Sequence, residues 1–258
     1  RSLECFNRKG VNMSEKLFQY RKETANFDAS KLLEWGIKTF GVSKVALASS
    51  LGAEDQVLTD MFLAENNKAR IFTLDTGRQF QETYDVMHEC TTKYSFAYEI
   101  CFPEPVEVSE LVAIKGPNLF YNSIDDRKSC CEVRKMKPLR KVLSTVDCWI
   151  TGLRKQQSVT RTDFHSVEWD ENFNIYKLNP LIDWLEVNVW EYIQENGVPY
   201  NKLHDVGFPS IGCQPCTRAI KHGQDVRAGR WWWETPEQKE CGLHWKDGKL
   251  VKKNQEKV

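Results

Sequence analysis

The feature that most limits the fold of this chain is a regular alternation of short apolar segments with longer helical segments. An apolar stretch at Val45–Ala48 precedes a helical pattern from about Glu54, and "ARIFTLDTG" precedes the helical "QETYDVMHECTTKY". The apolar segments "FAYEICFP" and "DCWITGL" continue the series, and the amphipathic "LEVNVWEYIQENG" ends at Gly197. Strands that alternate with helices favour an α/β fold, so we expect a central, mainly parallel sheet flanked by helices.

Composition excludes several classes of function. The chain has 258 residues, and Lys+Arg and Asp+Glu balance at 36 each, which argues against a general nucleic-acid-binding surface. No apolar run approaches the about 18 residues of a membrane-spanning helix, so no membrane association is expected. The N-terminal residues lack the apolar core of a secretory signal, which predicts a reducing, cytoplasmic location.

Three polar segments follow predicted strands, at Ser49–Glu54, Asp75–Arg78 and Thr151–Arg161. Ligands of parallel sheets bind beyond the carboxyl ends of the strands, so these segments predict a site. In "SSLGAED", small residues at a helix N-terminus suit an anion, although a tight turn that needs Gly52 would give the same pattern. "LDTGR" supplies a carboxylate, a hydroxyl and a guanidinium, and could also be a capped turn.

The third segment, "TGLRKQQSVTR", combines cations with amide and hydroxyl donors. Arg154, Lys155 and Arg161 stand with Gln157 and Ser158 directly after a buried strand. Such groups suit a phosphate or sulfate ligand. The alternative is a solvated surface loop. The presence of three such polar loops at successive strand ends argues against that alternative.

The cysteines give the strongest indication of chemistry. An odd number of cysteines in a chain without a signal argues against a disulfide framework and for metal-binding or catalytic thiols. The nine are Cys5, Cys90, Cys101, Cys130, Cys131, Cys148, Cys213, Cys216 and Cys241.

Four of these thiols, in the adjacent pair of "SCCEVRK" and the Cys-x-x-Cys of "GCQPCT", are candidate ligands of one metal group. They are Cys130, Cys131, Cys213 and Cys216. Four thiolates suit either a tetrahedral zinc ion or a [4Fe–4S] cluster. We prefer the cluster, because adjacent sulfurs fit poorly around one small ion but can each bind a separate iron. A redox-active Cys-x-x-Cys is a third interpretation.

A basic run surrounds the adjacent pair. Between Arg127 and Lys141 there are seven Lys or Arg residues and one acid, Glu132. With helical spacing, Arg134 and Lys135 each follow a cysteine by four residues on the same face. These cations could offset the charge of a thiolate-bound cluster or reach an anionic substrate. A basic solvent-exposed face is the alternative, and we adopt it for Arg140 and Lys141.

One thiol near the end of the chain has the surroundings of a nucleophile. Cys241 stands in "KECGLHW", between Lys239 and His244, where cations would favour its thiolate. Upstream, "RAGRWWWE" adds Arg227 and Arg230 as candidate phosphate ligands beside a tryptophan triplet. A thiol without a chemical role is the alternative for Cys241.

These segments together resemble the assimilatory adenosine 5′-phosphosulfate reductases of the phosphoadenylyl/adenylyl-sulfate reductase family. The resemblance extends from about Val45 to His244, and the paired Cys-Cys with Cys-x-x-Cys is its most specific part. It implies an ATP-pyrophosphatase-like fold, a modified phosphate loop at Ser49–Glu54, and a role in sulfate assimilation and cysteine biosynthesis. The segments that carry it are "SSLGAED", "LDTGR", "SCCEVRK", "TGLRKQQSVTR", "IGCQPCTR", "GRWWWE" and "KECGLH".

The resemblance also implies a mechanism. Cys241 would attack the sulfur of adenosine 5′-phosphosulfate, release AMP and become an S-sulfonate, from which thioredoxin or a similar dithiol protein would release sulfite. The [4Fe–4S] cluster on the four paired cysteines would organise the site through Lys135, since the dithiol supplies the electrons. The expected substrate-binding residues are Ser49, Ser50, Gly52, Glu54, Asp75, Thr76, Gly77, Arg78, Lys135, Arg154, Arg161, Arg227, Arg230 and His244.

Two rival functions stay open at this stage. One is a reductase for the 3′-phosphorylated nucleotide, and the other is a nucleotide-binding zinc protein without redox chemistry. We expect a homo-oligomer with three parts. These are an N-terminal extension at 1–25 that is partly disordered, an α/β nucleotide-binding and iron–sulfur reductase domain at 26–228, and a mobile C-terminal segment at 229–258 that carries Cys241.

Overall fold

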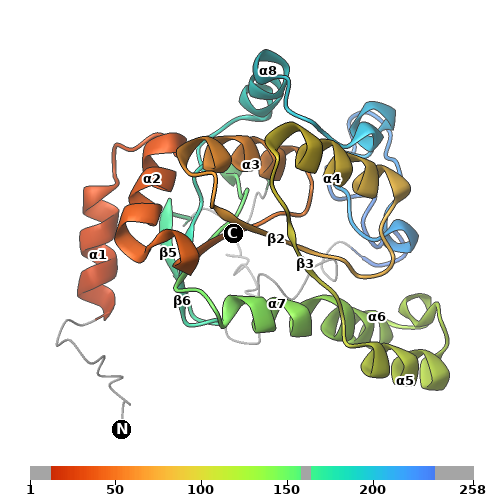
Figure 1. The fold of residues 1–258 in the computed structure, drawn as a ribbon. Coiled ribbons are helices and arrows are strands. Elements are labelled where there is room, and N and C mark those ends of the chain that lie inside the picture. The colour runs from red at the N-terminus through yellow and green to blue at the C-terminus, as the bar shows by residue number, and fades with distance from the viewer. Residues whose placement is uncertain (1–12, 158–163, 236–258) are drawn as a thin grey trace, which may run out of the picture. The chain divides into compact units, whose positions relative to one another are not determined.

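The structure is a computed structural model that describes residues 13–157 and 164–235 (Figure 1). Its helices are α1 (Met13–Glu23), α2 (Ala29–Phe40), α3 (Ala53–Glu65), α4 (Gln81–Tyr94), α5 (Pro105–Lys115), α6 (Ile124–Cys131), α7 (Lys137–Leu143) and α8 (Glu186–Asn196). Its strands are β1 (Val45–Ala48), β2 (Arg70–Leu74), β3 (Glu99–Cys101), β4 (Cys148–Ile150), β5 (Val167–Asp170) and β6 (Ile175–Leu178). Short helical turns connect several of these elements.

The chain divides into two compact units. The first comprises Arg1–Thr73, Gln81–Ile100 and Leu143–Asn201, and the second comprises Leu74–Phe80, Cys101–Val142 and Lys202–Val258. The three-part division expected from the sequence stays a prediction. Within the described ranges, no helix has both the length and the apolar character needed to cross a bilayer.

The first unit is built on a six-stranded sheet of order β3-β2-β1-β4-β6-β5. β1 pairs in parallel with β2 and β4, and β4 pairs in parallel with β6. β5 runs antiparallel to β6. The predicted α/β fold with a mainly parallel sheet is therefore confirmed.

The hairpin of β5 and β6 was not predicted. Its strands are four residues each and mix polar with apolar side chains, as in "VEWD" and "IYKL". Their extended conformation depends on pairing with β4 and with each other, which local sequence does not encode.

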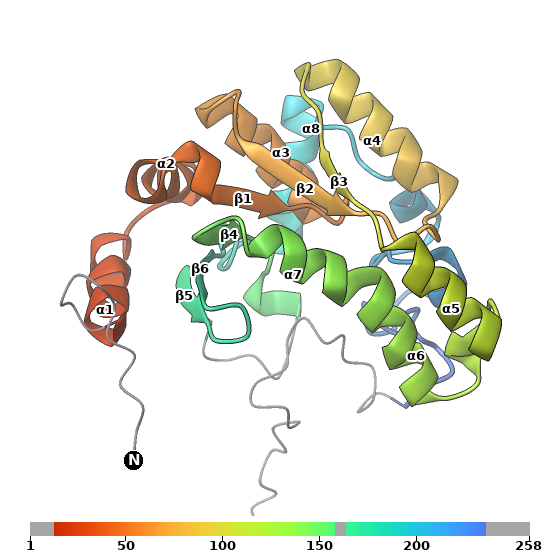
Figure 2. The ribbon, with the colours of Figure 1, turned by 60° about the horizontal axis from the view of Figure 1, so that its bottom comes forward.

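The core of the first unit lies where helices cover the sheet. α3, α4 and α8 lie on the same side of the sheet (Figure 2), and their inward side chains join those of β1 and β4 in one apolar cluster. Leu58 and Phe62 of α3 are fully buried in it. Burial of each such side chain stabilises the fold by about 1.5–3 kcal/mol, so this core positions the loops at the strand ends.

The second unit is organised around a helical run that contains the adjacent cysteines. α6 begins at its N-cap Ser123, whose hydroxyl accepts from Asp126 N at 3.1 Å. The run passes from α6 into one π-helical turn, Glu132–Met136, and continues as α7. In that turn Lys137 N donates to the carbonyl of Glu132, five residues back. Because Pro138 has no N–H to donate, a regular α-helix would be interrupted here.

Candidate active site

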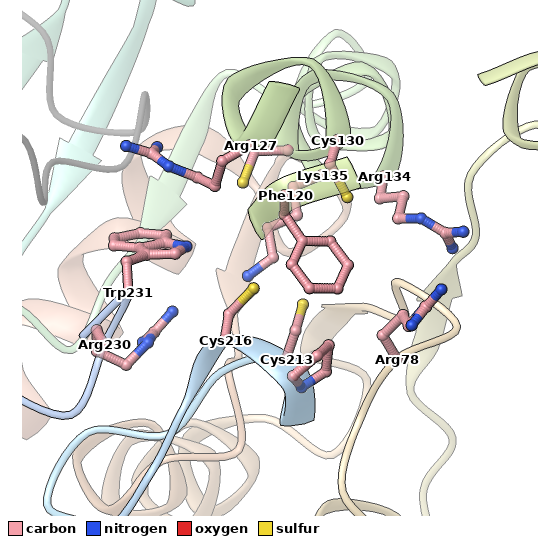
Figure 3. Close-up of a pocket in the computed structure, with 12 residues that line it drawn as sticks. Arg78, Phe120, Arg127, Cys130, Arg134, Lys135, Cys213, Cys216, Arg230 and Trp231 are labelled. Atoms are coloured by element: carbon pink, nitrogen blue, oxygen red, sulfur yellow. The ribbon is translucent and has the colours of Figure 1, made fainter. Parts of the chain in front are cut away.

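The four paired cysteines line one cavity in the second unit. It has about 410 Å³ of empty space, part of which is open to solvent. Figure 3 shows Cys130 pointing into it from the helical run, and Cys213 and Cys216 pointing in from the opposite side. Its walls are Arg78, Phe120, Arg127, Cys130, Cys131, Arg134, Lys135, Cys213, Pro215, Cys216, Arg230 and Trp231.

Thr76, from the predicted "LDTGR" segment, connects the two cysteine segments. Its Oγ1 lies 3.2 Å from Cys213 Sγ, and its carbonyl accepts from Arg134 Nη1 at 2.6 Å. Gln214 N donates to the carbonyl of Arg78 at 2.8 Å. Three segments that the sequence analysis selected separately are thereby brought to one place.

The "LDTGR" segment is a tight turn held by its own side chains. Asp75 Oδ1 accepts from Gly77 N at 2.8 Å, and Arg78 N donates to Thr76 Oγ1 at 3.3 Å. Gly77 has φ +69°, a left-handed conformation that glycine adopts without strain. Asp75 therefore caps this turn, which brings Thr76 to Cys213 and Arg78 to the cavity wall, and the substrate-binding role of Asp75 stays a prediction.

Cations dominate the electrostatics of the cavity. Arg78, Arg134, Lys135 and Arg230 line it with Arg127, and no described residue of its wall is acidic. Figure 3 shows the Lys135 side chain extending from the helical run toward Cys216. The predicted placement of Arg134 and Lys135 beside the cysteines is confirmed, although a π turn rather than regular α-helical spacing achieves it.

The thiols respond differently to this environment. Burial raises the pKa of Cys130, and burial together with the neighbouring Cys213 and Cys131 raises the pKa of Cys216 to about 12. Burial also acts to raise the pKa of Cys213, but the charge of Lys135 and the contact with Thr76 outweigh it and leave that pKa lowered. Of these three thiols, Cys213 is therefore the one that its surroundings favour as a thiolate.

Two further arginines were predicted to bind substrate. Arg230 lines the cavity, and its Nη1 donates to the carbonyl of Ile211 at 3.2 Å. Gly212 leaves room for it, because a Cβ there would overlap the guanidinium and make that side chain shift. Arg227 lies in the preceding turn, where its N donates to Asp225 Oδ1 at 2.8 Å, and it is not part of the cavity wall.

The donor set of the cavity fits an iron–sulfur cluster. Four sulfurs, no hard oxygen ligand and a surplus of cations suit a negatively charged thiolate-bound group. Among the described residues, no three His, Cys, Asp or Glu side chains are close enough together to hold one metal ion.

The "SSLGAED" loop lies in the first unit, where its donors are satisfied internally. Ser50 N and Oγ donate to Asp55 Oδ2 at 2.7 and 2.6 Å. Leu51 N donates to Ser49 Oγ at 3.2 Å, and Gly52, the N-cap of α3, donates its N–H to Ser50 Oγ at 3.4 Å. The loop is thus a preformed turn that directs few unused N–H groups outward.

Glu54 joins this loop to the segment after β4. Its Oε1 accepts from Arg154 Nε at 2.9 Å and from Gln157 Nε2 at 2.8 Å. Arg154 is only 5% exposed. Two predicted substrate ligands, Glu54 and Arg154, therefore bind each other in this structure.

Asp55 was missed by the sequence analysis. It is buried, and burial raises its pKa to about 6 despite the hydrogen bonds from Ser50. A Cβ at Gly152 would overlap Asp55 Oδ1, so the start of α3 approaches the end of β4 closely. The signal that could have found Asp55 is the Glu54-Asp55 pair at the start of a buried helix, where both acids need partners.

Several predicted residues lie outside the described residues. They are Arg161, Cys241 and His244.

Comparisons with known proteins show the family of this chain. Residues 44–219 match the family described as phosphoadenosine phosphosulfate reductase domain. The chain is 49% identical over 203 residues to the adenosine 5′-phosphosulfate reductase of Allochromatium vinosum, which covers 79% of each chain. It resembles the phosphoadenylyl-sulfate reductase of Candida auris, solved with phosphate, at a TM-score of 0.70 and 26% identity, covering 81% of this chain and 98% of that one.

A more distant likeness concerns the fold alone. Yeast FAD synthetase, solved with FAD, superposes with a TM-score of 0.52 at 14% identity, covering 81% of this chain and 76% of that one.

Proposed function

Because the chain belongs to the phosphoadenosine phosphosulfate reductase family, we propose that it reduces adenosine 5′-phosphosulfate to sulfite and AMP. The observation that carries the proposal is the single cation-rich cavity lined by Cys130, Cys131, Cys213 and Cys216. The A. vinosum relative, named for this substrate, supports it over the 3′-phosphorylated nucleotide.

Cys241 is the proposed nucleophile. Its thiolate attacks the sulfate sulfur, the bond from that sulfur to the bridging oxygen breaks, and AMP leaves with the electron pair. The product is a Cys241 S-sulfonate. A thiol of thioredoxin or a similar dithiol protein then attacks Cys241 Sγ and releases sulfite, and the second thiol of that protein resolves the mixed disulfide. The dithiol supplies both electrons and returns Cys241 as a thiol.

The anionic end of the substrate needs cations. We assign this role to Lys135 and Arg230, which line the cavity, and to Arg227 and His244. Arg161 is assigned a helping role. Arg154 is held by Glu54, so we assign these two residues to keeping the nucleotide loop Ser49–Glu54 in place.

The four paired cysteines would hold a [4Fe–4S] cluster, which when bound supplies a compact anionic group that joins both cysteine segments. Arg134 and Lys135 would offset its charge. Thr76 holds Cys213 in place, and its carbonyl fixes Arg134.

The proposal also covers the cellular location of the enzyme, its reductant and its oligomeric state. The described cysteines are all free thiols, which suits a cytoplasmic enzyme served by a separate dithiol protein. We also propose that the enzyme is a homo-oligomer.

Mass spectrometry tests the reaction directly. Protein mixed with adenosine 5′-phosphosulfate, without a dithiol, should gain one sulfonate on Cys241. Cys241→Ser should abolish the adduct and sulfite formation while the protein retains its iron. Cys101→Ser, which changes a half-buried thiol outside the cavity wall, should behave like the wild type.

Three results would overturn or correct the proposal. Sulfite formation by Cys241→Ser would remove the assigned nucleophile. A colourless protein that contains zinc instead of iron and sulfide would favour the zinc protein. Faster turnover of the 3′-phosphorylated nucleotide would correct the substrate.

A further inference from the structure

A buried ion pair in the second unit joins two segments that the proposed function uses. Arg127 Nε donates to Glu234 Oε1 at 2.9 Å, and Arg127 Nη2 donates to Glu234 Oε2 at 2.7 Å. The two side chains are 1% and 2% exposed. This geometry fixes the direction of both side chains, because a guanidinium and a carboxylate bind through two parallel hydrogen bonds.

Each partner stands next to a proposed functional residue in the chain. Arg127 lies on α6, three residues before Cys130, and lines the cavity. Glu234 precedes Cys241 by seven residues. Seven residues span at most about 25 Å, so the position of Glu234 limits where Cys241 can reach.

Trp231 braces the ion pair against the second cysteine segment. The guanidinium of Arg127 lies 4.6 Å from the centroid of its ring. Trp231 N donates to the carbonyl of Cys216 at 3.1 Å, and Glu234 N donates to the carbonyl of Trp231 at 2.9 Å. Trp231 has φ +40°, an unusual conformation for a bulky residue that persists only where the surroundings hold it.

The pair is difficult to explain by stability alone. Removing two charges from water costs free energy that their attraction often does not fully offset, so buried ion pairs are weak evidence for stability. What the pair does supply is a fixed connection from α6, which carries Cys130 and Cys131, to the segment just before Cys241.

We propose that the Arg127–Glu234 pair, braced by Trp231, is a positioning device that couples the metal-loaded state of the cavity to the reactivity of Cys241. A group bound by all four thiols fixes α6 relative to the Cys213–Cys216 segment. Arg127 is fixed with α6, Glu234 is fixed with Arg127, and the chain that leads to Cys241 starts from a defined point. This inference rests on the proposed cluster and nucleophile.

The test measures the alkylation rate of Cys241 by iodoacetamide, followed by mass spectrometry, in full-length protein before and after iron chelation. In the wild type, the two rates should differ by at least about fivefold, the lower end of typical coupling between sites. In Glu234→Gln, the two rates should be equal within error, because the charged connection is lost.

Two variants separate coupling from folding. Glu107→Gln removes a more exposed ion pair, to Lys137 at 2.7 Å, that also contacts the helical run, and it should keep the wild-type difference. Arg127→Met with Glu234→Met replaces the pair by apolar side chains. It should recover thermal stability if Glu234→Gln has lost it, and should still lack the difference in rates.

The inference fails if either ion-pair variant keeps the wild-type difference, or if Glu107→Gln loses it as well. Its failure is distinguishable from failure of the proposed function. Absence of iron, or of a sulfonate on Cys241, rejects the proposed function. A wild-type alkylation rate that does not respond to chelation, with sulfonate formation intact, rejects only the coupling.

Discussion

At the scale of single residues, two neighbouring carboxylates in this protein have different kinds of binding partner. Glu54 and Asp55 are adjacent at the start of α3, yet Glu54 binds a guanidinium and Asp55 binds only Ser50 and backbone groups. The partner therefore decides whether each buried charge is compensated. Both residues secure the same loop, but changes to them should have different consequences.

Glu54→Ala should destabilise the protein by about 3 kcal/mol, because it leaves the buried Arg154 without its carboxylate. Chemical denaturation followed by circular dichroism measures the change. Glu34→Ala breaks the exposed pair with Lys38 and should cost only about 0.5 kcal/mol. Equal effects of the two variants would contradict this account.

Asp55 should make stability depend on pH. Burial raises its folded pKa to about 6 from an unfolded value of 3.8, so the folded state holds a proton that the unfolded state releases. Stability should therefore fall as pH rises from about 4 to about 6, by about 3 kcal/mol from this group. Between pH 4 and pH 6, the midpoint of denaturation should fall less steeply with pH in Asp55→Asn than in the wild type. Parallel curves for the two proteins would refute the assignment.

At the scale of elements, the π turn Glu132–Met136 decides which way the basic side chains point. It follows Cys131 directly and precedes α7. Because a π turn contains one residue more than an α turn, one extra residue lies between the cysteines and the rest of the run. Such turns occur frequently at functional sites. Here the turn allows Arg134 and Lys135 to line the same cavity as the cysteines.

Deletion of Val133 should convert the π turn to regular α-helix and place Lys135 three instead of four residues after Cys131, which changes the direction of its side chain. Lys135 would then leave the cavity wall, and the purified protein should contain much less iron. Val133→Ala, which keeps the register, is the control and should retain iron. Full iron content in the deletion variant would show that the turn is not needed.

At the scale of the whole molecule, the two units differ in the size of their cores. The first unit has an extensive apolar cluster along its sheet. Among the described residues, a buried cluster of the second unit consists of only Leu119, Phe120, Cys216 and Trp231, with the other paired cysteines packed against it. A ligand that binds only the folded state adds stability, so the second unit should depend on its metal group more than the first.

Hydrogen exchange should reveal this dependence. After iron chelation, amides of Ile124–Cys131 and Gln214–Cys216 should exchange at least about tenfold faster, because local opening costs less free energy. Amides of Val45–Ala48 and Cys148–Ile150 should be unaffected. A uniform acceleration in both units would instead indicate global unfolding.

The sequence by itself determined the class of fold and indicated the family. Alternating apolar and helical segments led to the parallel sheet, since backbone periodicity is a local property. The two cysteine pairs indicated a shared thiolate site, because thiols that are far apart in the chain can still bind the same metal group. Structure and comparisons confirm the fold and the family, and the cluster and the role of Cys241 stay predictions.

Only the tertiary structure decided which distant side chains became partners. Glu54 binds Arg154, and Arg127 binds Glu234, across separations of 100 and 107 residues. The pairing of β6 with β4 and the burial of Asp55 likewise depend on segments that are not adjacent in the chain. Such pairings arise from packing of whole elements, so local sequence patterns show that a charge needs a partner but not which residue supplies it.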